Sequence, residues 1–246
     1  MRRASPLWRR GLLALALLAW CALALQLALA LRIAWMAWWD PASTTFQRSE
    51  IARLLVEKRR VEWSQTWVDY DRISVHLKRA VIASEDAEFT GHTGVDWDAI
   101  EKAWDRNQRV QAQAARRGAP PPVAKLRGGS TITQQLAKNL LLSGERTVFR
   151  KGQELLLAWM LELLLDKRRI LELYLNHVEW GEGLFGAQAA ARHYFRIDAA
   201  RLSPEQAARL AVMLPAPKRF ERRPASSYLL GRSATILARM PAVELP

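Results

Sequence analysis

The sequence predicts a mainly α-helical domain attached to one N-terminal transmembrane helix. Three observations lead to this prediction. A long apolar run opens the chain, apolar residues recur at helical spacing through most of the remainder, and no segment shows the period-two alternation that is typical of strands. Half of the 246 residues are hydrophobic, which is enough for the core of one large domain or two small ones.

The apolar run covers residues 11–31 and contains a single amide, Gln26. A helix needs about 20 apolar residues to cross the hydrocarbon core of a bilayer, so the run predicts a transmembrane anchor at residues 11–32. The alternative is a cleaved signal peptide with residues 28–30 as its cleavage site. Cleavable apolar segments span only about 7–15 residues, and therefore we expect an uncleaved anchor.

Basic residues before the anchor predict its orientation. Four arginines stand within residues 1–10, and tryptophans follow the anchor at positions 35, 38 and 39. The positive-inside rule makes residues 1–10 a cytoplasmic basic tail, and the tryptophans are typical of an interfacial belt. We expect a single-pass protein of the inner (cytoplasmic) membrane, with its main domain in the periplasm. The net charge of +13 then indicates membrane lipid or a phosphate-bearing lipid as partner, and no nucleic acid.

Residues 33–74 are predicted to be an interfacial linker and a membrane-proximal helix. Residues 40–45 are polar, and residues 47–62 combine basic side chains with apolar spacing. The basic side chains face lipid headgroups or form a plain solvated surface, and the sequence leaves both interpretations open. The lone Cys21 excludes an intramolecular disulfide and a cysteine-based metal site.

The main domain is predicted to span residues 75–246. Helical spacing predicts helices at residues 75–84, 95–110, 150–165, 167–176 and 187–195. Two further helices are predicted to start at the capping pairs Thr131/Gln134 and Ser203/Gln206. Residues 111–127 are rich in Ala, Arg and Gln and include three consecutive prolines, which predicts a mobile loop. The loop is either a lid or plain disorder.

Three carboxylates, Glu85, Asp86 and Glu88, lie close together where the apolar run 80–83 ends. A carboxylate held against apolar surface has a raised pKa, as a general acid or base near neutral pH requires. The alternative is an ordinary helix end with solvated acids and a glycine stop. His92 is interpreted as a structural residue. A metal site of Asp86, Glu88 and His92 fits no common spacing, and we expect no metal ligand there.

A second polar block occupies the predicted helix start at residues 129–139. Gln135, Lys138 and Asn139 share one helix face. A helix N-terminus carries partial positive charge and free N–H groups, which suits phosphate; Arg146 adds a further charge. A well-capped surface helix would explain the cap but not the other polar residues.

Glu154 interrupts a strongly apolar helix. It forms either a simple pair with Arg150, four residues earlier, or a polar group that faces a cleft. In the second case Glu85 and Glu154 form a candidate carboxylate pair for glycosyl chemistry.

Five ordered motifs between residues 75 and 217 resemble the family 51 glycosyltransferases, the peptidoglycan glycosyltransferases. In layout the chain is similar to the monofunctional biosynthetic peptidoglycan transglycosylases, because it ends without the Ser-x-x-Lys motif of a transpeptidase domain. The first motif, Glu-Asp-x-x-Phe-x-x-His-x-Gly, is Glu85, Asp86, Phe89, His92 and Gly94. The second, Gly-Gly-Ser-Thr-Ile-Thr-Gln-Gln, is complete at residues 128–135. The other three comprise Arg150, Lys151 and Glu154; Lys167, Ile170, Leu171, Glu172, Tyr174, Leu175 and Asn176; and Gly183, Gly186, Ala187, Ala190, Tyr194 and Phe195.

The resemblance implies a lysozyme-like helical glycosyltransferase domain that polymerises lipid II into β-1,4-linked glycan strands and releases undecaprenyl pyrophosphate. The transfer would invert the anomeric centre, with Glu85 as the general base. Glu154 would orient the pyrophosphate or help to bind a divalent cation, Mg or Mn; no cofactor beyond that is implied.

The resemblance also implies the substrate-binding residues. Lys138 and Arg146 would stabilise the leaving pyrophosphate with help from Arg150 and Lys151, and the donor site would be lined by Ser130, Gln135 and Asn139. The partners implied are lipid II, the growing glycan chain, membrane lipid, and cell-division or wall-synthesis proteins. Two rivals remain open: a lytic muramidase on the same fold, and a non-catalytic membrane scaffold.

Overall fold

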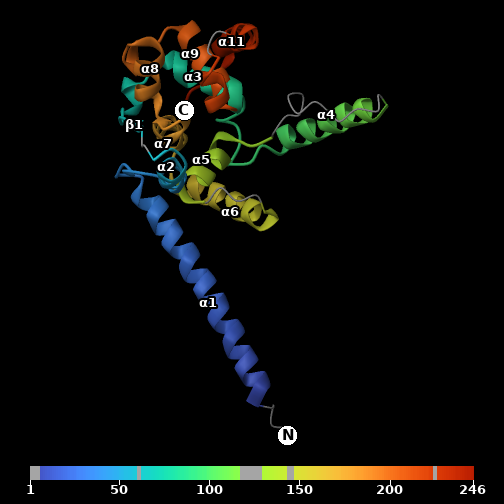
Figure 1. Ribbon diagram of the computed structural model, residues 1–246. Coiled ribbons are helices and arrows are strands. Elements are labelled where there is room, and N and C mark those ends of the chain that lie inside the picture. The colour runs from blue at the N-terminus through green and yellow to red at the C-terminus, as the bar shows by residue number, and fades with distance from the viewer. Residues whose placement is uncertain (1–5, 60–61, 117–128, 143–146, 224–225) are drawn as a thin grey trace.

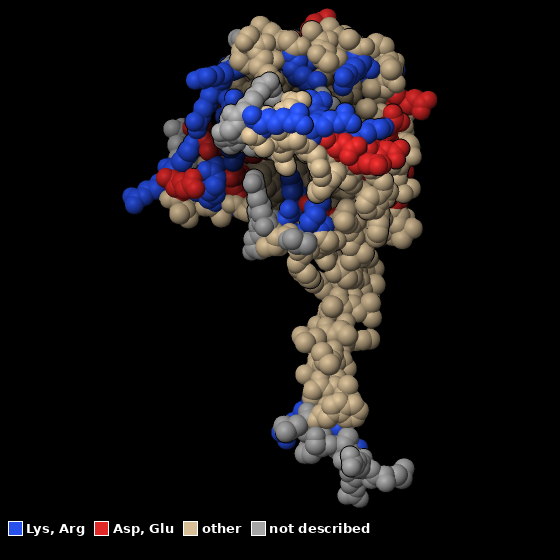
Figure 2. All heavy atoms as spheres, turned by 90° about the vertical axis from the view of Figure 1, so that its right-hand side faces the viewer, with Lys and Arg blue, Asp and Glu red and all other residues tan. Residues whose placement is uncertain are grey.

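The computed structural model describes residues 6–59, 62–116, 129–142, 147–223 and 226–246. Helix α1 (Pro6–Trp35) extends from the body of the molecule as a long stem (Figure 1). Residues Trp8–Trp35 are long and apolar enough to cross a membrane. The helix expected at residues 11–32 is therefore present, and it extends beyond these bounds at both ends. Figure 2 shows this face of the stem uncharged along most of its length, with Lys or Arg side chains at its N-terminal end.

The body is built from helices, which confirms the predicted mainly α fold. Helices α3 (Val75–Glu85), α9 (Pro204–Met213) and α11 (Ser227–Arg239) pack against one another. Helix α5 (Ile132–Leu141) packs against α2 (Thr45–Lys58), α6 (Val148–Leu164) and α7 (Lys167–His177). Further helical elements of the body are α8 (Ala187–Phe195), α10 (Pro217–Glu221) and the 3₁₀ turns η1 (Tyr70–Arg72), η3 (Ala199–Arg201) and η4 (Met240–Ala242).

Side chains cap several of these helices as the sequence predicts. The Ser203/Gln206 capping box is complete at the start of α9. At the start of α5, the Thr131 side chain accepts a hydrogen bond from the N–H of Gln134 at 3.1 Å. Each such cap satisfies a backbone donor that the first helical turn leaves unpaired.

Helix α4 (Trp97–Arg116) projects sideways from the body (Figure 1). It continues through residues 111–116, where a mobile loop was predicted, so that part of the prediction is wrong. The physical reason is that Ala, Gln and Arg are good helix formers, although they bury little. Residues 117–127 of the predicted loop lie outside the described residues.

A small sheet joins the segment after α2 to the second half of the chain. Strand β1 (Ser64–Gln65) pairs in parallel with β3 (Leu184–Phe185), and β2 (Glu179–Gly181) pairs with β3 in the antiparallel sense. These strands were not predicted, because strands of two or three residues are too short to show an alternating pattern.

Residues before the expected domain start at residue 75 also contribute to the buried core. Ile33 and Met36, at the end of the anchor, and Tyr70 and Ile73 all belong to the buried core cluster. The Arg169 side chain also donates a hydrogen bond to the carbonyl oxygen of Met36 at 2.7 Å. Residues 33–74 are therefore part of the domain and not only an interfacial linker.

Candidate active site

Glu85 is the last residue of α3, and its side chain is held by α5. Its Oε2 accepts a hydrogen bond from Nε2 of Gln135 at 3.0 Å, and its Oε1 accepts one from Ser84 Oγ at 3.3 Å. The Oε1 atom of Gln135 in turn accepts a hydrogen bond from the hydroxyl of the buried Tyr174 at 3.0 Å. The row Tyr174–Gln135–Glu85 therefore fixes one carboxylate at the junction of α3, α5 and α7.

Burial raises the pKa of Glu85 above its ordinary value. The hydrogen bonds from Gln135 and Ser84 oppose this rise, the charge of Asp86 adds to it, and the charge of Arg232 opposes it. The pKa nevertheless stays raised because taking a carboxylate out of water disfavours its charged form more than these partners favour it. Glu85 is thus a carboxylate that gains a proton readily, as a general base requires.

Asp86 connects three segments of the site. Its Oδ2 accepts the backbone N–H of Ile132 at the first turn of α5, at 2.9 Å, and its Oδ1 lies 2.9 Å from Nε2 of His92. A carboxylate at a helix N-terminus is stabilised by the helix dipole. Asp86 and His92 therefore hold α3, the following turn and α5 together, which agrees with the structural interpretation of His92.

A cationic cluster surrounds Glu154 on α6. Glu154 is 4% exposed and pairs with Arg150 at 2.8 Å and with Lys151 through a short contact. The Nζ atom of Lys151 also lies 3.4 Å from Oγ of Ser130 and 3.5 Å from Oε1 of Gln134. Glu154 therefore pairs with Arg150, as the first alternative expects, and Glu154 itself is buried.

The two predicted carboxylates, Glu85 and Glu154, are both connected to the first turn of α5. Glu85 is bound to Gln135, and Glu154 reaches the neighbouring Gln134 through Lys151. Of the other predicted substrate-binding residues, Asn139 is buried and Lys138 is exposed on α5, and Arg146 lies outside the described residues. Figure 2 shows basic side chains gathered over the face toward which α4 and α6 project.

Sequence reasoning missed two residues of the site. Arg232 on α11 is close enough for its charge to act on Glu85, but no motif includes it and its helix was not predicted. Tyr174 lies in the fourth motif, where it received no role. Its place three residues after Leu171 on an apolar helix face is also what an ordinary core residue would show.

The carboxylate oxygens of Asp86 and Glu154 are engaged by partners within the chain. Oxygen atoms of this kind are the ligands that a divalent cation takes. In the described part of the chain, no three His, Cys, Asp or Glu side chains converge on one point.

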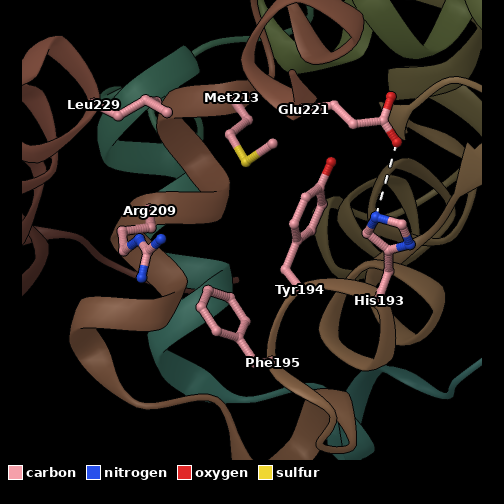
Figure 3. Close-up of a pocket in the computed structure, with 7 residues that line it drawn as sticks. All are labelled: His193, Tyr194, Phe195, Arg209, Met213, Glu221 and Leu229. Atoms are coloured by element: carbon pink, nitrogen blue, oxygen red, sulfur yellow. Dashed lines mark ion pairs between the residues drawn. The ribbon is translucent and has the colours of Figure 1, made fainter. Parts of the chain in front are cut away.

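A separate cavity of about 240 Å³ lies between α8, α9, α10 and α11 (Figure 3). Arg209 and Met213 of α9 line it, whereas Ala211 of the same helix faces Ser84 beside Glu85, with its carbonyl oxygen 3.5 Å from Oγ of Ser84. The cavity is therefore on the other side of α9 from Glu85. It contains none of the predicted site residues.

Comparison with known proteins identifies the family. Residues 52–241 match the family described as Transglycosylase. The "Biosynthetic peptidoglycan transglycosylase" of Bordetella avium (strain 197N) is 55% identical over 221 residues, 90% of this chain and 89% of the relative. The proteins of the same name from Bordetella pertussis and Burkholderia pseudomallei are 53% and 52% identical, covering 97% and 91% of this chain and 96% and 83% of the relatives.

The chain belongs to the transglycosylase family. It is therefore a glycosyltransferase, and the expected resemblance is confirmed. The match begins at residue 52, within α2, before the expected domain start at residue 75. The transglycosylase also carries α1, a helix suited to membrane anchoring.

Tyr174→Phe tests whether the Tyr174–Gln135–Glu85 row orients the carboxylate of this transglycosylase. We expect about a three- to tenfold loss of rate, the equivalent of roughly one hydrogen bond, because Gln135 loses the donor that fixes its amide. A weaker Gln135 contact also raises the pKa of Glu85 further, so the acidic limb of the pH–rate profile moves to higher pH. The matched control is Tyr194→Phe, since the Tyr194 hydroxyl donates to the Trp180 carbonyl oxygen at 2.9 Å, remote from Glu85. Equal profiles for the two variants would contradict the orienting role.

Proposed function

We propose that the chain polymerises lipid II into β-1,4-linked glycan strands by inverting transfer, with Glu85 as the general base. The carboxylate takes the proton of the 4-hydroxyl group of the acceptor GlcNAc, and that oxygen attacks C1 of the donor MurNAc. The bond from C1 to the pyrophosphate breaks, and undecaprenyl pyrophosphate leaves with the bonding electron pair. The observation that carries this proposal is the raised pKa of a carboxylate oriented by Gln135.

The cationic cluster supports the leaving-group side of the proposal. Negative charge develops on the pyrophosphate as the bond breaks, and fixed positive groups stabilise such charge where it forms. Lys151, Arg150 and the N-terminal turn of α5 lie together beside Ser130. We propose that Lys138, Arg146, Ser130 and Asn139 complete this binding surface.

The anchor supports a location beside the lipid substrate. Helix α1 has the length and composition to cross a bilayer, and Arg9 and Arg10 stand at its N-terminal end. By the positive-inside rule the N-terminus is cytoplasmic and the body lies on the periplasmic side of the inner membrane. The active site then meets a substrate whose undecaprenyl chain is buried in the same membrane.

A lytic muramidase is the second candidate, because a carboxyl group with a raised pKa also suits a general acid. Cleavage of a glycan produces no pyrophosphate, however, and gives the cationic cluster no charge to stabilise. Purified lipid II and intact peptidoglycan separate the two functions. We expect polymer from lipid II and no soluble fragments from peptidoglycan, and the reverse result would contradict the proposal.

Glu154→Gln tests the role of the second carboxylate. The amide keeps the shape of the side chain but removes the charge that holds Arg150 and Lys151 in place. We expect about a 10–10²-fold loss of polymerisation rate, the size of effect that a small misplacement of reacting groups produces. Glu101→Gln, on the exposed face of α4, is the matched control. If Glu154→Gln polymerised lipid II as fast as this control, the assignment of Glu154 to the site would fail.

A further inference from the structure

Two amides join the anchor to the helix that carries the cationic cluster. Nε2 of Gln26 donates to Oε1 of Gln153 at 3.2 Å, and Nε2 of Gln153 donates to Oε1 of Gln26 at 3.1 Å. Gln26 is the single amide in the apolar run 11–31. Its neighbours Leu25 and Leu27 are 57% and 59% exposed, as expected of side chains that face lipid. The single polar side chain of the apolar run therefore points toward α6, whereas its two neighbours in sequence point away from it.

The pair lies at hydrocarbon depth if residues 11–31 cross the bilayer. Gln26 is five residues before Leu31, which places it about 7.5 Å below the outer edge of the span at 1.5 Å per residue. An unpaired amide costs several kcal/mol in hydrocarbon. Each amide here satisfies the other, and side-chain hydrogen bonds of this kind hold transmembrane helices together.

The partner helix is suited to the same environment. Phe149, one turn before Gln153, is 86% exposed, and Leu163 at the far end of α6 is 84% exposed. Gln153 directly precedes Glu154, which holds Arg150 and Lys151. Any movement of Gln153 against the anchor therefore moves the cationic cluster relative to the bilayer.

We propose that the Gln26–Gln153 pair is a positioning device that fixes the depth of α6 in the membrane. It sets the level at which the cluster around Glu154 meets a lipid-linked pyrophosphate. Neither glutamine is assigned contact with the substrate, so both act through α6. The identity of the substrate rests on the proposed function, whereas the fixed depth rests on the contact itself.

The first test compares Gln26→Met, Gln153→Met and the double variant in the full chain reconstituted in bilayers. Methionine keeps the size and helix propensity of glutamine but removes both hydrogen bonds. We expect KM for bilayer-embedded lipid II to rise about 3–18-fold in the single variants, from roughly 0.6–1.7 kcal/mol for such a pair, with kcat within about twofold. The double variant should lose no more than the single variants, because either change already breaks the pair and the double variant leaves no unpaired amide. A KM equal to that of the wild type, or additive losses, would overturn the proposal.

The matched control moves the amide to another face of α1. Leu27→Gln in the Gln26→Met background restores the polarity of the anchor but not the contact with α6. We expect no recovery of KM. Recovery would show that the polarity of the anchor matters and its pairing does not, which would overturn the proposal.

The second test measures depth without using activity. A spin label at Phe149→Cys, in a Cys21→Ala background, reports its depth through its relative accessibility to oxygen and to a water-soluble nickel chelate. We expect Gln26→Met to change this depth or broaden its distribution, while Leu27→Gln in the wild-type background leaves it unchanged. If the depth of the label were unchanged in Gln26→Met, the proposal that the Gln26–Gln153 pair fixes the depth of α6 would be refuted, even if the enzyme polymerises lipid II. If the wild type failed to polymerise lipid II, the proposed function would fail, and the depth measurement would still decide on the pair.

Discussion

Glu85→Gln is expected to lower the rate of lipid II polymerisation by about 10²–10⁴-fold, the usual contribution of a general base. The amide keeps the volume of the side chain and a partner for Gln135, but it cannot take a proton from the acceptor hydroxyl. Consumption of purified lipid II by the two proteins is the measurement. Glu88→Gln, an exposed neighbour in the same acidic stretch, serves as the control and should keep the wild-type rate. A polymerisation rate for Glu85→Gln within about twofold of the wild type would remove Glu85 from the mechanism.

The same residue predicts a pH dependence with a definite sign. The pKa of Glu85 is raised by burial, so the base loses activity as the pH falls through a value above that of an ordinary glutamate. Because the folded-state pKa lies above the unfolded one, the contribution of Glu85 to stability is complete below the unfolded pKa. It is lost as the pH rises through the folded pKa.

Glu85→Gln does not titrate, and its thermal stability relative to the wild type should therefore improve as the pH rises. Such a variant would be inactive and at least as stable as the wild type at neutral pH. A melting temperature that drops below that of the wild type at neutral pH would contradict this expectation.

Gly183→Ala is expected to destabilise the domain by more than about 3 kcal/mol, a large part of the total of roughly 5–15 kcal/mol for a typical domain. Gly183 has φ +69°, and an added Cβ would lie 2.0 Å from the carbonyl oxygen of Glu62. The left-handed conformation alone costs an alanine about 1–2 kcal/mol. The clash is with the backbone of Glu62, which cannot rotate away as a side chain could. The N–H of Ser64 donates to the carbonyl oxygen of Gly183 at 2.9 Å, so relieving the clash requires β1 to move away from β3.

The measurement for Gly183→Ala is the midpoint of thermal or denaturant unfolding of the full chain. Gly152→Ala is the control, because an added Cβ there meets nothing within 4 Å and alanine favours the helix. We expect Gly152→Ala to be neutral or slightly stabilising. Equal unfolding midpoints for the two variants would show that β1 does not pack against Gly183.

The elements that carry the site could be predicted because their signals are local. Helix α3 combines apolar spacing with an acidic end, and α5 starts at a threonine cap that the structure contains. The contact between Gln135 and Glu85 could not be predicted from spacing, because it joins residues on two helices that only the tertiary fold brings together. The same applies to Arg232, which reaches the site through the packing of α11 against α3.

Two misinterpretations have physical causes in the sequence. Residues 111–116 have the low hydrophobicity of a loop, but their Ala, Gln and Arg residues also favour a helix, and α4 includes them. Strands β1 and β3 each contain two residues, and two residues cannot display a period. In the first case the residue pattern supported more than one structure, and in the second the segments were too short to show a pattern.

The burial of Ile33 and Met36 in the core has a consequence for how the body is oriented in the membrane. The end of α1 is packed rigidly against the body, because Ile33 is in the core and Arg169 donates a hydrogen bond to Met36. No flexible linker therefore separates the helix from the body. A transmembrane helix answers a change in hydrocarbon thickness by tilting, and here the whole catalytic body must tilt with it. The thickness of the surrounding hydrocarbon therefore sets the angle between the body and the membrane plane.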